Sequence, residues 1–172
     1  MALVALVLIG AGTIRTPAQM SESALKAEFL FAFAKYAEWP EDVLSPTAPI
    51  VLCVADAEVG TALAGIATGR SVNQHPVIVS RVKLDDSLRP CILLYAGKFD
   101  KRRTVQMATT LGTASVLTVG DAQAFAESGG MIGFFEVDGL MKFAINLDAV
   151  ERRRIRLSAQ LLKIAKIVKG GP

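Results

Sequence analysis

Residues 131–146 read MIGFFEVDGLMKFAIN, in which Asp138-Gly139 separates two apolar runs. A two-residue β-turn needs positive φ at both central positions, and Asp-Gly is one of the pairs that supply it, so the pattern predicts a tight hairpin. The expected pairs across this hairpin are Val137 with Leu140, Phe134 with Phe143, and Ile132 with Ile145.

Both faces of the predicted hairpin are mostly apolar. Because side chains alternate along a strand, one face carries Ile132, Phe134, Met141, Phe143 and Ile145. The other carries Met131, Phe135, Val137, Leu140 and Ala144, together with Lys142 and Asn146. A hairpin that is apolar on both sides needs cover on both, which predicts a sheet between two layers of helices.

The rest of the chain alternates between apolar runs and amphipathic segments, which predicts an α/β sandwich with a mixed, mostly parallel sheet. The expected strands are 50–55, 76–79, 91–96 and 115–119. The expected helices are 22–39, 59–67, 101–111, 123–127, 149–153 and 157–168. Asp148 and Glu151 resemble a capping box for the fifth helix, and the last should dock through Leu157, Leu161, Ile164 and Val168. Without repeats or linkers, residues 22–169 are expected to form one domain.

Composition and charge exclude several classes of protein. The 172 residues are 52% hydrophobic and 20% charged, as in ordinary globular chains, so disorder is not expected. A net charge of only +3 does not predict a nucleic-acid partner. Seven of the eight charged residues from Glu151 onward are basic, a pattern that favours a solvated face over a surface for acidic proteins or phosphate head groups.

The N-terminal segment has the features of a secretory leader. Residues 2–12 are apolar, too short to span a bilayer, and Thr16-Pro17-Ala18 supplies small residues for cleavage. Neither Lys nor Arg precedes the apolar run, so the amino terminus is the sole positive charge there. Residues 1–18 are therefore predicted to be a signal peptide, with a buried N-terminal strand as the alternative.

The first predicted helix, 22–39, is rich in aromatic residues and ends before Pro40. Ser21 or Ser23 is the expected cap. Its aromatic residues, at Phe29, Phe31, Phe33, Tyr36 and Trp39, exceed what one buried stripe needs, because Phe31 and Trp39 lie off that stripe. The excess predicts a partner surface, with complete burial of all five rings as the alternative.

Catalytic and metal-binding patterns are missing from the sequence. The lone His75 lies in a polar turn without a neighbouring nucleophile, and with Cys53 and Cys91 it has no paired zinc spacing. Ser128-Gly129-Gly130 precedes a strand rather than a phosphate-binding helix, and Asp85-Asp86 with Asp100 does not match a receiver domain. No catalytic residue, metal or cofactor is predicted.

The oxidation state of the two cysteines depends on the cellular compartment of the protein. Cys53 lies inside the first apolar run and Cys91 begins the run expected beside it. An exported protein would join them in a disulfide, whereas a cytosolic one would keep them reduced. The predicted leader favours the disulfide.

Several segments, taken in order, resemble the YfiR family of periplasmic proteins: KAEFLFAFAKYAEWP, IVLCVAD, CILLYAG, SVLTVGD, FAESGGMIGFF, MKFAINLDAV and RLSAQLLKIAKIV. The resemblance extends from Ala24 to Val168. It implies a compact α/β sandwich, often dimeric, that represses an inner-membrane diguanylate cyclase and is relieved by an outer-membrane lipoprotein.

The resemblance also assigns positions. Cys53 and Cys91 match the family's cysteine pair, and the family's glycine turn, hairpin-ending asparagine and helix-opening serine fall on Gly129, Gly130, Asn146 and Ser158. Arg154 departs from the family by standing where a glycine often ends the short helix, which predicts a local change in that turn.

Two functions follow from the sequence. The first is a periplasmic regulator, not an enzyme, that contacts a membrane signalling protein through its aromatic first helix or basic C-terminal segment. The second is a small-molecule-binding module with a pocket at the carboxyl ends of the strands, near Asp56, Gly97 and Gly120.

Overall fold

The computed structural model describes residues 20–83, 88 and 90–170. The predicted leader, residues 1–18, and the acidic pair Asp85-Asp86 lie outside the described residues. The helices are α1 (Glu22–Tyr36), α2 (Ala57–Ala67), α3 (Lys101–Leu111), α4 (Gln123–Glu127), α5 (Leu147–Arg152) and α6 (Ala159–Ile164). The strands are β1 (Ala37–Glu38), β2 (Ile50–Val54), β3 (Ser71–Val72), β4 (His75–Arg81), β5 (Leu93–Gly97), β6 (Leu117–Gly120), β7 (Ile132–Val137), β8 (Leu140–Asn146), β9 (Arg156–Leu157) and β10 (Lys166–Val168).

The main sheet has the strand order β10-β8-β7-β6-β5-β2-β4-β3. Its centre, from β7 to β4, is parallel, whereas β8 is antiparallel to β7 and β3 is antiparallel to β4. At the far edge β10 runs parallel to β8, and β1 and β9 form a separate antiparallel pair. The predicted α/β sandwich with a mixed, mostly parallel sheet is confirmed.

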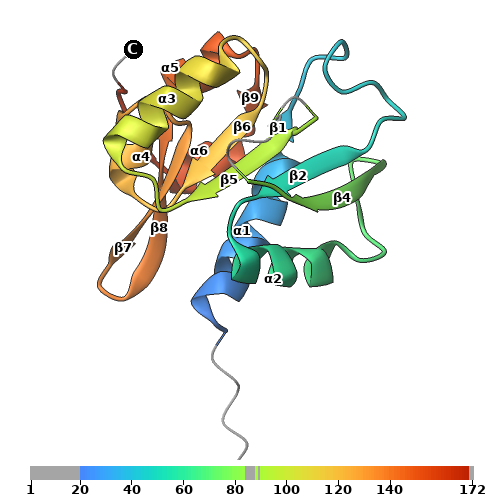
Figure 1. Ribbon diagram of the computed structural model, residues 1–172, viewed down its shortest axis with the longest axis horizontal. Coiled ribbons are helices and arrows are strands. Elements are labelled where there is room, and N and C mark those ends of the chain that lie inside the picture. Colours follow the sequence, from blue (N-terminus) through green and yellow to red (C-terminus); the bar gives the residue numbers. More distant parts are fainter. Residues whose placement is uncertain (1–19, 84–87, 89, 171–172) are drawn as a thin grey trace, which may run out of the picture.

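Helices cover both faces of this sheet (Figure 1). The larger core lies under α1 and α2, where the buried side chains include Leu30, Phe33 and Leu63. The smaller core lies under α3 and α4 and contains Met107 and Phe125. The sheet therefore separates two apolar layers, as the two-faced hairpin predicts.

The predicted hairpin is confirmed as β7 and β8. Asp138 (φ 53°) and Gly139 (φ 74°) form the turn, and the three predicted residue pairs are all present. Its first face packs under α1, whereas its second face is covered only at the base, where α4 contacts both strands. The tip is open, and Val137 and Leu140 are 44% and 60% exposed.

Local sequence signals place several elements correctly. Helices α3 and α4 occupy their predicted bounds, and Ser21 caps α1 by accepting a hydrogen bond from the Ala24 amide. Helix α1 ends at Tyr36 rather than Trp39, because Ala37 and Glu38 pair with β9 instead of continuing the helix. The polar turn predicted around His75 contains β3, which reverses into β4 through Asn73 and Gln74, both at positive φ.

The prediction for the C-terminal segment is wrong in part. The expected helix 157–168 is helical only in α6, and Lys166–Val168 instead extends the sheet beside β8. The open edge of β8 offers ladder hydrogen bonds to these residues, which outweigh their helical pattern. Leu161 is buried as predicted, whereas Ile164 is 67% exposed and does not dock on the sheet.

Helix α5 also begins earlier than predicted. Its N-cap is Asn146, whose side chain accepts a hydrogen bond from the Ala149 amide at 3.1 Å, rather than Asp148. The asparagine amide also donates to the Ala126 carbonyl at 2.9 Å and is fully buried.

Among the described residues, no helix combines the length and the hydrophobicity needed to cross a membrane.

Candidate functional site

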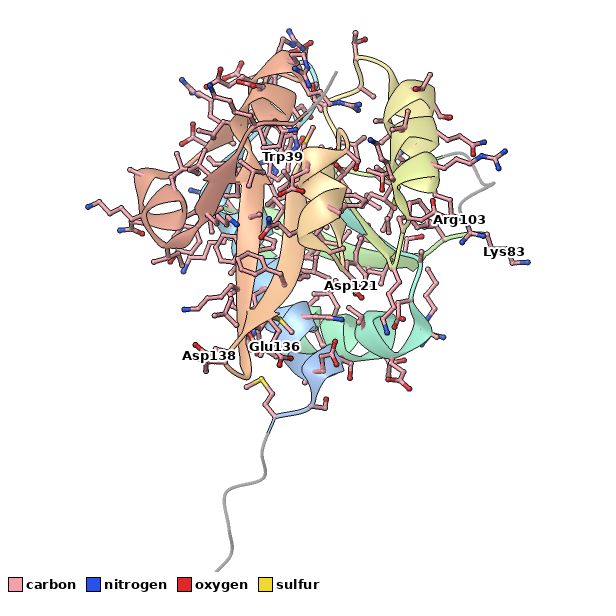
Figure 2. All side chains as sticks on the ribbon, turned by 90° about the vertical axis from the view of Figure 1, so that its left-hand side faces the viewer. Trp39, Lys83, Arg103, Asp121, Glu136 and Asp138 are labelled. Carbon is pink, nitrogen blue, oxygen red and sulfur yellow. A yellow bond between two sulfur atoms is a disulfide. The ribbon has the colours of Figure 1, made fainter. Side chains whose placement is uncertain are left out.

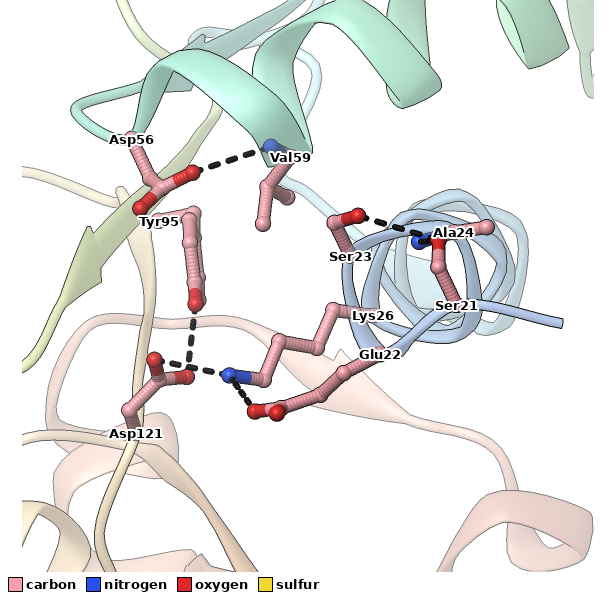
Figure 3. A network of polar contacts seen from close by, with 9 residues as sticks. All are labelled: Ser21, Glu22, Ser23, Ala24, Lys26, Asp56, Val59, Tyr95 and Asp121. Carbon is pink, nitrogen blue, oxygen red and sulfur yellow. Dashed lines mark hydrogen bonds and ion pairs between the residues drawn. The ribbon is translucent and has the colours of Figure 1, made fainter.

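A buried polar cluster joins α1 to the carboxyl ends of the central strands (Figure 3). Lys26 Nζ lies 2.9 Å from Asp121 Oδ2 and 2.6 Å from Glu22 Oε1. The Tyr95 hydroxyl donates to Asp121 Oδ1 at 2.6 Å. The side chains of Lys26 and Asp121 are only 9% and 7% exposed, whereas that of Glu22 is 72% exposed. We call Lys26, Tyr95 and Asp121 the polar cluster.

Each member of the polar cluster is positioned by its own element. Asp121 directly follows β6, and its amide donates to the Gly97 carbonyl at the end of β5. Tyr95 lies in β5 and is fully buried. Lys26 projects from the first turns of α1 toward the sheet (Figure 3). The carboxyl ends of parallel strands thus meet the start of the first helix, a usual location for sites in α/β folds.

The cluster perturbs its own ionisation. Burial alone would lower the pKa of Lys26, but the hydrogen bonds and negative charges of Glu22 and Asp121 outweigh it and raise this pKa. The hydrogen bond from Lys26, with its charge, lowers the pKa of Glu22. Burial, reinforced by Asp121, raises the pKa of Tyr95. Tyr95 is therefore a neutral hydrogen-bond donor and Lys26 a cation at every physiological pH.

A groove of about 380 Å³ lies beside the polar cluster, between the first turn of α1 and the hairpin. Its walls include Lys26 and Asp121 on one side and Phe135, Glu136 and Met141 on the other. Figure 2 shows the hairpin tip, with Glu136 and Asp138, next to the start of α1. Charged groups at the base and apolar walls above suit binding of a ligand or a peptide segment.

The three residues predicted for a ligand pocket do not line this groove. Asp56 caps α2 by accepting hydrogen bonds from the Glu58 and Val59 amides. Gly97 and Gly120 are neighbours across β5 and β6, and a Cβ on Gly120 would lie 2.4 Å from the ring of Phe125. Their part in ligand binding stays a prediction.

The members of the polar cluster were not predicted from the sequence. A signal for Asp121 was present, because it follows a strand end as Asp56 does, one residue after Gly120. Lys26 had a weaker signal, because it lies within the predicted first helix, one turn before Phe29. Tyr95 gave no signal within the continuous run CILLYA.

The five aromatic side chains of the first predicted helix all contact the larger core. Phe33 is fully buried, and its ring lies 5.1 Å from Phe143 and 5.7 Å from Phe134, measured between centroids. Phe29 packs on the same two rings, whereas Phe31, Tyr36 and Trp39 are half-buried elsewhere against the larger core. Their role at a partner surface stays a prediction.

The cysteines form the predicted disulfide. Cys53 in β2 is bonded to Cys91, with a Cα–Cα distance of 5.6 Å, on the face covered by α3. Neither sulfur is therefore free to bind a metal. The third sequence candidate, His75, places Nδ1 2.8 Å from the Ala48 carbonyl. Within residues 20–83, 88 and 90–170, no group of three potential ligands could hold a metal ion.

The remaining motif residues shape turns and helix ends. Gly129 has a φ of +100°, and a Cβ on Gly130 would lie 2.3 Å from the Phe125 ring. Ser158 caps α6 by accepting a hydrogen bond from the Leu161 amide. Arg154 adopts a φ of +56° after α5, so the turn keeps the left-handed conformation that glycine usually adopts there.

One protein-family model matches most of the chain. The model of the YfiR/HmsC-like family (DUF4154) matches residues 23–166, which include α1 after its first residue, the polar cluster, the disulfide and the hairpin. A search of curated proteins finds no significant match. Because the family model covers most of the chain, the protein belongs to the YfiR/HmsC-like family.

Proposed function

We propose that this protein is a periplasmic regulator that binds the outer domain of an inner-membrane diguanylate cyclase and represses it. The observation that carries the proposal is the family match over residues 23–166, because this family consists of regulators rather than enzymes. The disulfide supports an oxidising compartment. Export would require removal of the leader at residues 1–18.

The open tip of the hairpin and the adjoining first helix are the proposed contact surface. Val137 and Leu140 expose large apolar side chains beside the charged groups Glu136 and Asp138. Exposed apolar groups rimmed by polar ones favour protein contacts. The half-buried rings of Phe29, Phe31 and Tyr36 in α1, and Trp39 just beyond the helix, would extend this surface along the helix. Phe33, the fifth predicted contact residue, is fully buried.

Binding to the purified outer domain of a membrane cyclase tests this surface. The double variant Val137→Glu with Leu140→Glu should weaken binding at least about tenfold, because apolar anchors are lost and charge is added. Ile78→Glu is the matched control, since Ile78 is 49% exposed on β4 and lies away from the hairpin. Wild-type affinity of the double variant would exclude the tip from the interface.

A second test addresses the aromatic residues and the repression itself. Phe31→Gln and Trp39→Gln should weaken capture of the cyclase domain while circular dichroism stays unchanged.

Cells that lack this protein should contain more cyclic di-GMP than wild-type cells. Unchanged cyclic di-GMP in the presence of the cognate cyclase would contradict repression.

The assembly partners are part of the same proposal. A homodimer would present two copies of the contact surface, and an outer-membrane lipoprotein would release the cyclase by competing for it. Analytical ultracentrifugation of the mature chain tests whether a homodimer forms. Competition between purified lipoprotein and purified cyclase domain tests whether the two share one contact surface. A monomer at all concentrations, or binding of both partners at once, would contradict these parts.

A small-molecule-binding module is the second candidate function. It is favoured by the groove beside Lys26 and Asp121, at the strand ends where Asp56, Gly97 and Gly120 also lie. A metabolite that raises the melting temperature of the wild type should fail to do so for Asp121→Asn. Absence of stabilisation by any periplasmic metabolite would remove this candidate.

A further inference from the structure

A second groove, of about 340 Å³, lies where α5, the end of α3 and the loop after α4 meet. Helices α3 and α5 lie in the upper part of Figure 1, away from the open tip of the hairpin. None of the residues that line this groove is acidic, and two of them, Arg152 and Arg153, are basic. The groove therefore carries positive charge without an internal counter-charge.

Arg153 is the unusual member of this groove. It is 8% exposed, and its guanidinium donates to the Ala108 carbonyl at 2.9 Å and to the Ala114 carbonyl at 3.3 Å. The four ion pairs among the described residues use Lys26, Arg154 and Arg156, so Arg153 has no carboxylate partner there. A buried charge is normally paired, because transfer from water is costly.

Contacts with α3 explain only part of this arrangement. Ala108 lies in the last turn of α3, and its carbonyl accepts from the Gly112 amide as well as from Arg153. A guanidinium has five N–H donors, and these two bonds leave the others without a described acceptor. Burial, reinforced by the nearby charge of Arg152, lowers the pKa of Arg153, as expected for a cation without a counter-ion.

Other donors line the same groove. Ser128 is largely buried, and none of the hydrogen bonds between described residues uses its hydroxyl or the amide of Gly129. Thr113 adds an exposed hydroxyl. Val105 and Ala149 provide apolar walls. Donors at the base with apolar sides are the usual features of a site for a small organic anion.

We propose that this groove binds a small soluble anion, whose carboxylate or phosphate group is held by Arg153 and assisted by Ser128 and Gly129. Arg152 attracts the anion from the rim, and the apolar walls contact its organic part. The inference goes beyond the regulatory function, because it assigns a ligand site that shares no residue with the proposed partner surface.

Titration of the oxidised mature chain tests the site without any mutation. Inorganic phosphate and succinate are the probes, added separately, with sodium chloride at equal ionic strength as the control. The Nε–H signal of Arg153 and the amide signal of Gly129 should shift and saturate at millimolar concentrations in nitrogen-15 NMR spectra. The proposal would be overturned if the Nε–H signals of the exposed Arg102 and Arg103 shifted as much as that of Arg153 and did not saturate. It would also be overturned if neither probe shifted the signals of Arg153 and Gly129.

Two variants test whether the anion binds at Arg153 in this groove. Arg153→Lys keeps the charge but loses the planar fork, so affinity for the responding probe should fall about tenfold. Arg156→Lys is the matched control, because Arg156 is exposed and pairs with Glu38 outside the groove. Where Arg153→Lys does not fold, Ser128→Ala takes its place and should weaken binding severalfold. Unchanged affinity in a folded variant of either kind overturns the assignment.

Sedimentation with vesicles distinguishes a lipid head group from a soluble anion. Vesicles that contain phosphatidylglycerol should not capture the protein in an Arg153-dependent way. Such capture without a response to free phosphate or succinate would overturn the assignment to a soluble ligand. None of these measurements requires the cyclase, so failure here and failure of the regulatory function remain distinct.

Discussion

Lys26 and Asp121 lie 95 positions apart in the chain and form a largely buried ion pair of 2.9 Å. The pair fixes the start of α1 against the end of β6, beside the groove at the hairpin. Removal of one partner from such a pair leaves an uncompensated charge.

Lys26→Met should therefore destabilise the protein by about 3 kcal/mol, because Asp121 would keep its charge without its cation. The measurement is the free energy of unfolding in urea. Glu22→Gln is the matched control and should cost less than about 1 kcal/mol, because the Glu22 side chain is 72% exposed. Equal small losses would mean that the buried pair contributes no more than a surface pair.

Alkaline pH should weaken the fold through Tyr95 and Lys26. Both have a folded-state pKa above the ordinary value, 10.0 for tyrosine and 10.5 for lysine. Their contribution to the free energy of unfolding is complete below these ordinary values. It is lost as pH rises toward the folded-state pKa, because the unfolded chain releases the protons first.

Urea unfolding at about pH 8 and about pH 11 measures this loss. Tyr95→Phe should reduce the difference between the two pH values, although it lowers stability at pH 8 by removing the hydrogen bond to Asp121. If the free energy of unfolding fell by the same amount between the two pH values in wild type and in Tyr95→Phe, Tyr95 would be excluded as a source of the alkaline loss of stability.

Loss of the disulfide should destabilise the chain strongly. Cys53 and Cys91 are separated by 38 positions, and opening a loop of this length costs about 4 kcal/mol in the chain-entropy model. The double variant Cys53→Ala with Cys91→Ala should show this loss in urea, and a reductant should then have no further effect on it. A reductant that leaves wild-type stability unchanged would contradict the prediction.

Gly130→Ala should destabilise the protein by about 2 kcal/mol, because its Cβ would meet the Phe125 ring and the carbonyl of the same residue. Gly65→Ala in α2 is the opposite case, since no atom lies within 4 Å of its Cβ position. It should stabilise the protein by about 0.5–1 kcal/mol, because alanine favours helix. Thermal unfolding of both variants checks the pair, and a change of the same sign in both would contradict it.

Arg154→Gly should stabilise the turn after α5 by about 1 kcal/mol, because Arg154 has a φ of +56°. The ion pair lost with Asp42 is exposed and contributes little. Arg154→Ala removes the same ion pair but keeps a Cβ at positive φ, so it should bring no gain. Equal stability of the glycine and alanine variants would show that the turn is unstrained.

Short-range signals in the sequence were sufficient for much of the fold. The Asp138-Gly139 turn and the bounds of α3 depend on neighbouring residues alone, so they were predictable. Lys166–Val168 was not, because its strand conformation depends on the free edge of β8. The polar cluster was hidden for a related reason, since Lys26, Tyr95 and Asp121 come from three separate elements and meet only in the folded chain.

The pairing of early segments with late ones constrains the order of folding. Helix α1 packs on rings of the hairpin, β1 pairs with β9, and β10 completes the sheet beside β8. The native topology cannot be completed until β10 has left the ribosome, so α1 and β1 wait for their partners during synthesis. Under the proposed export, this delay would keep the polypeptide unfolded while it crosses the membrane.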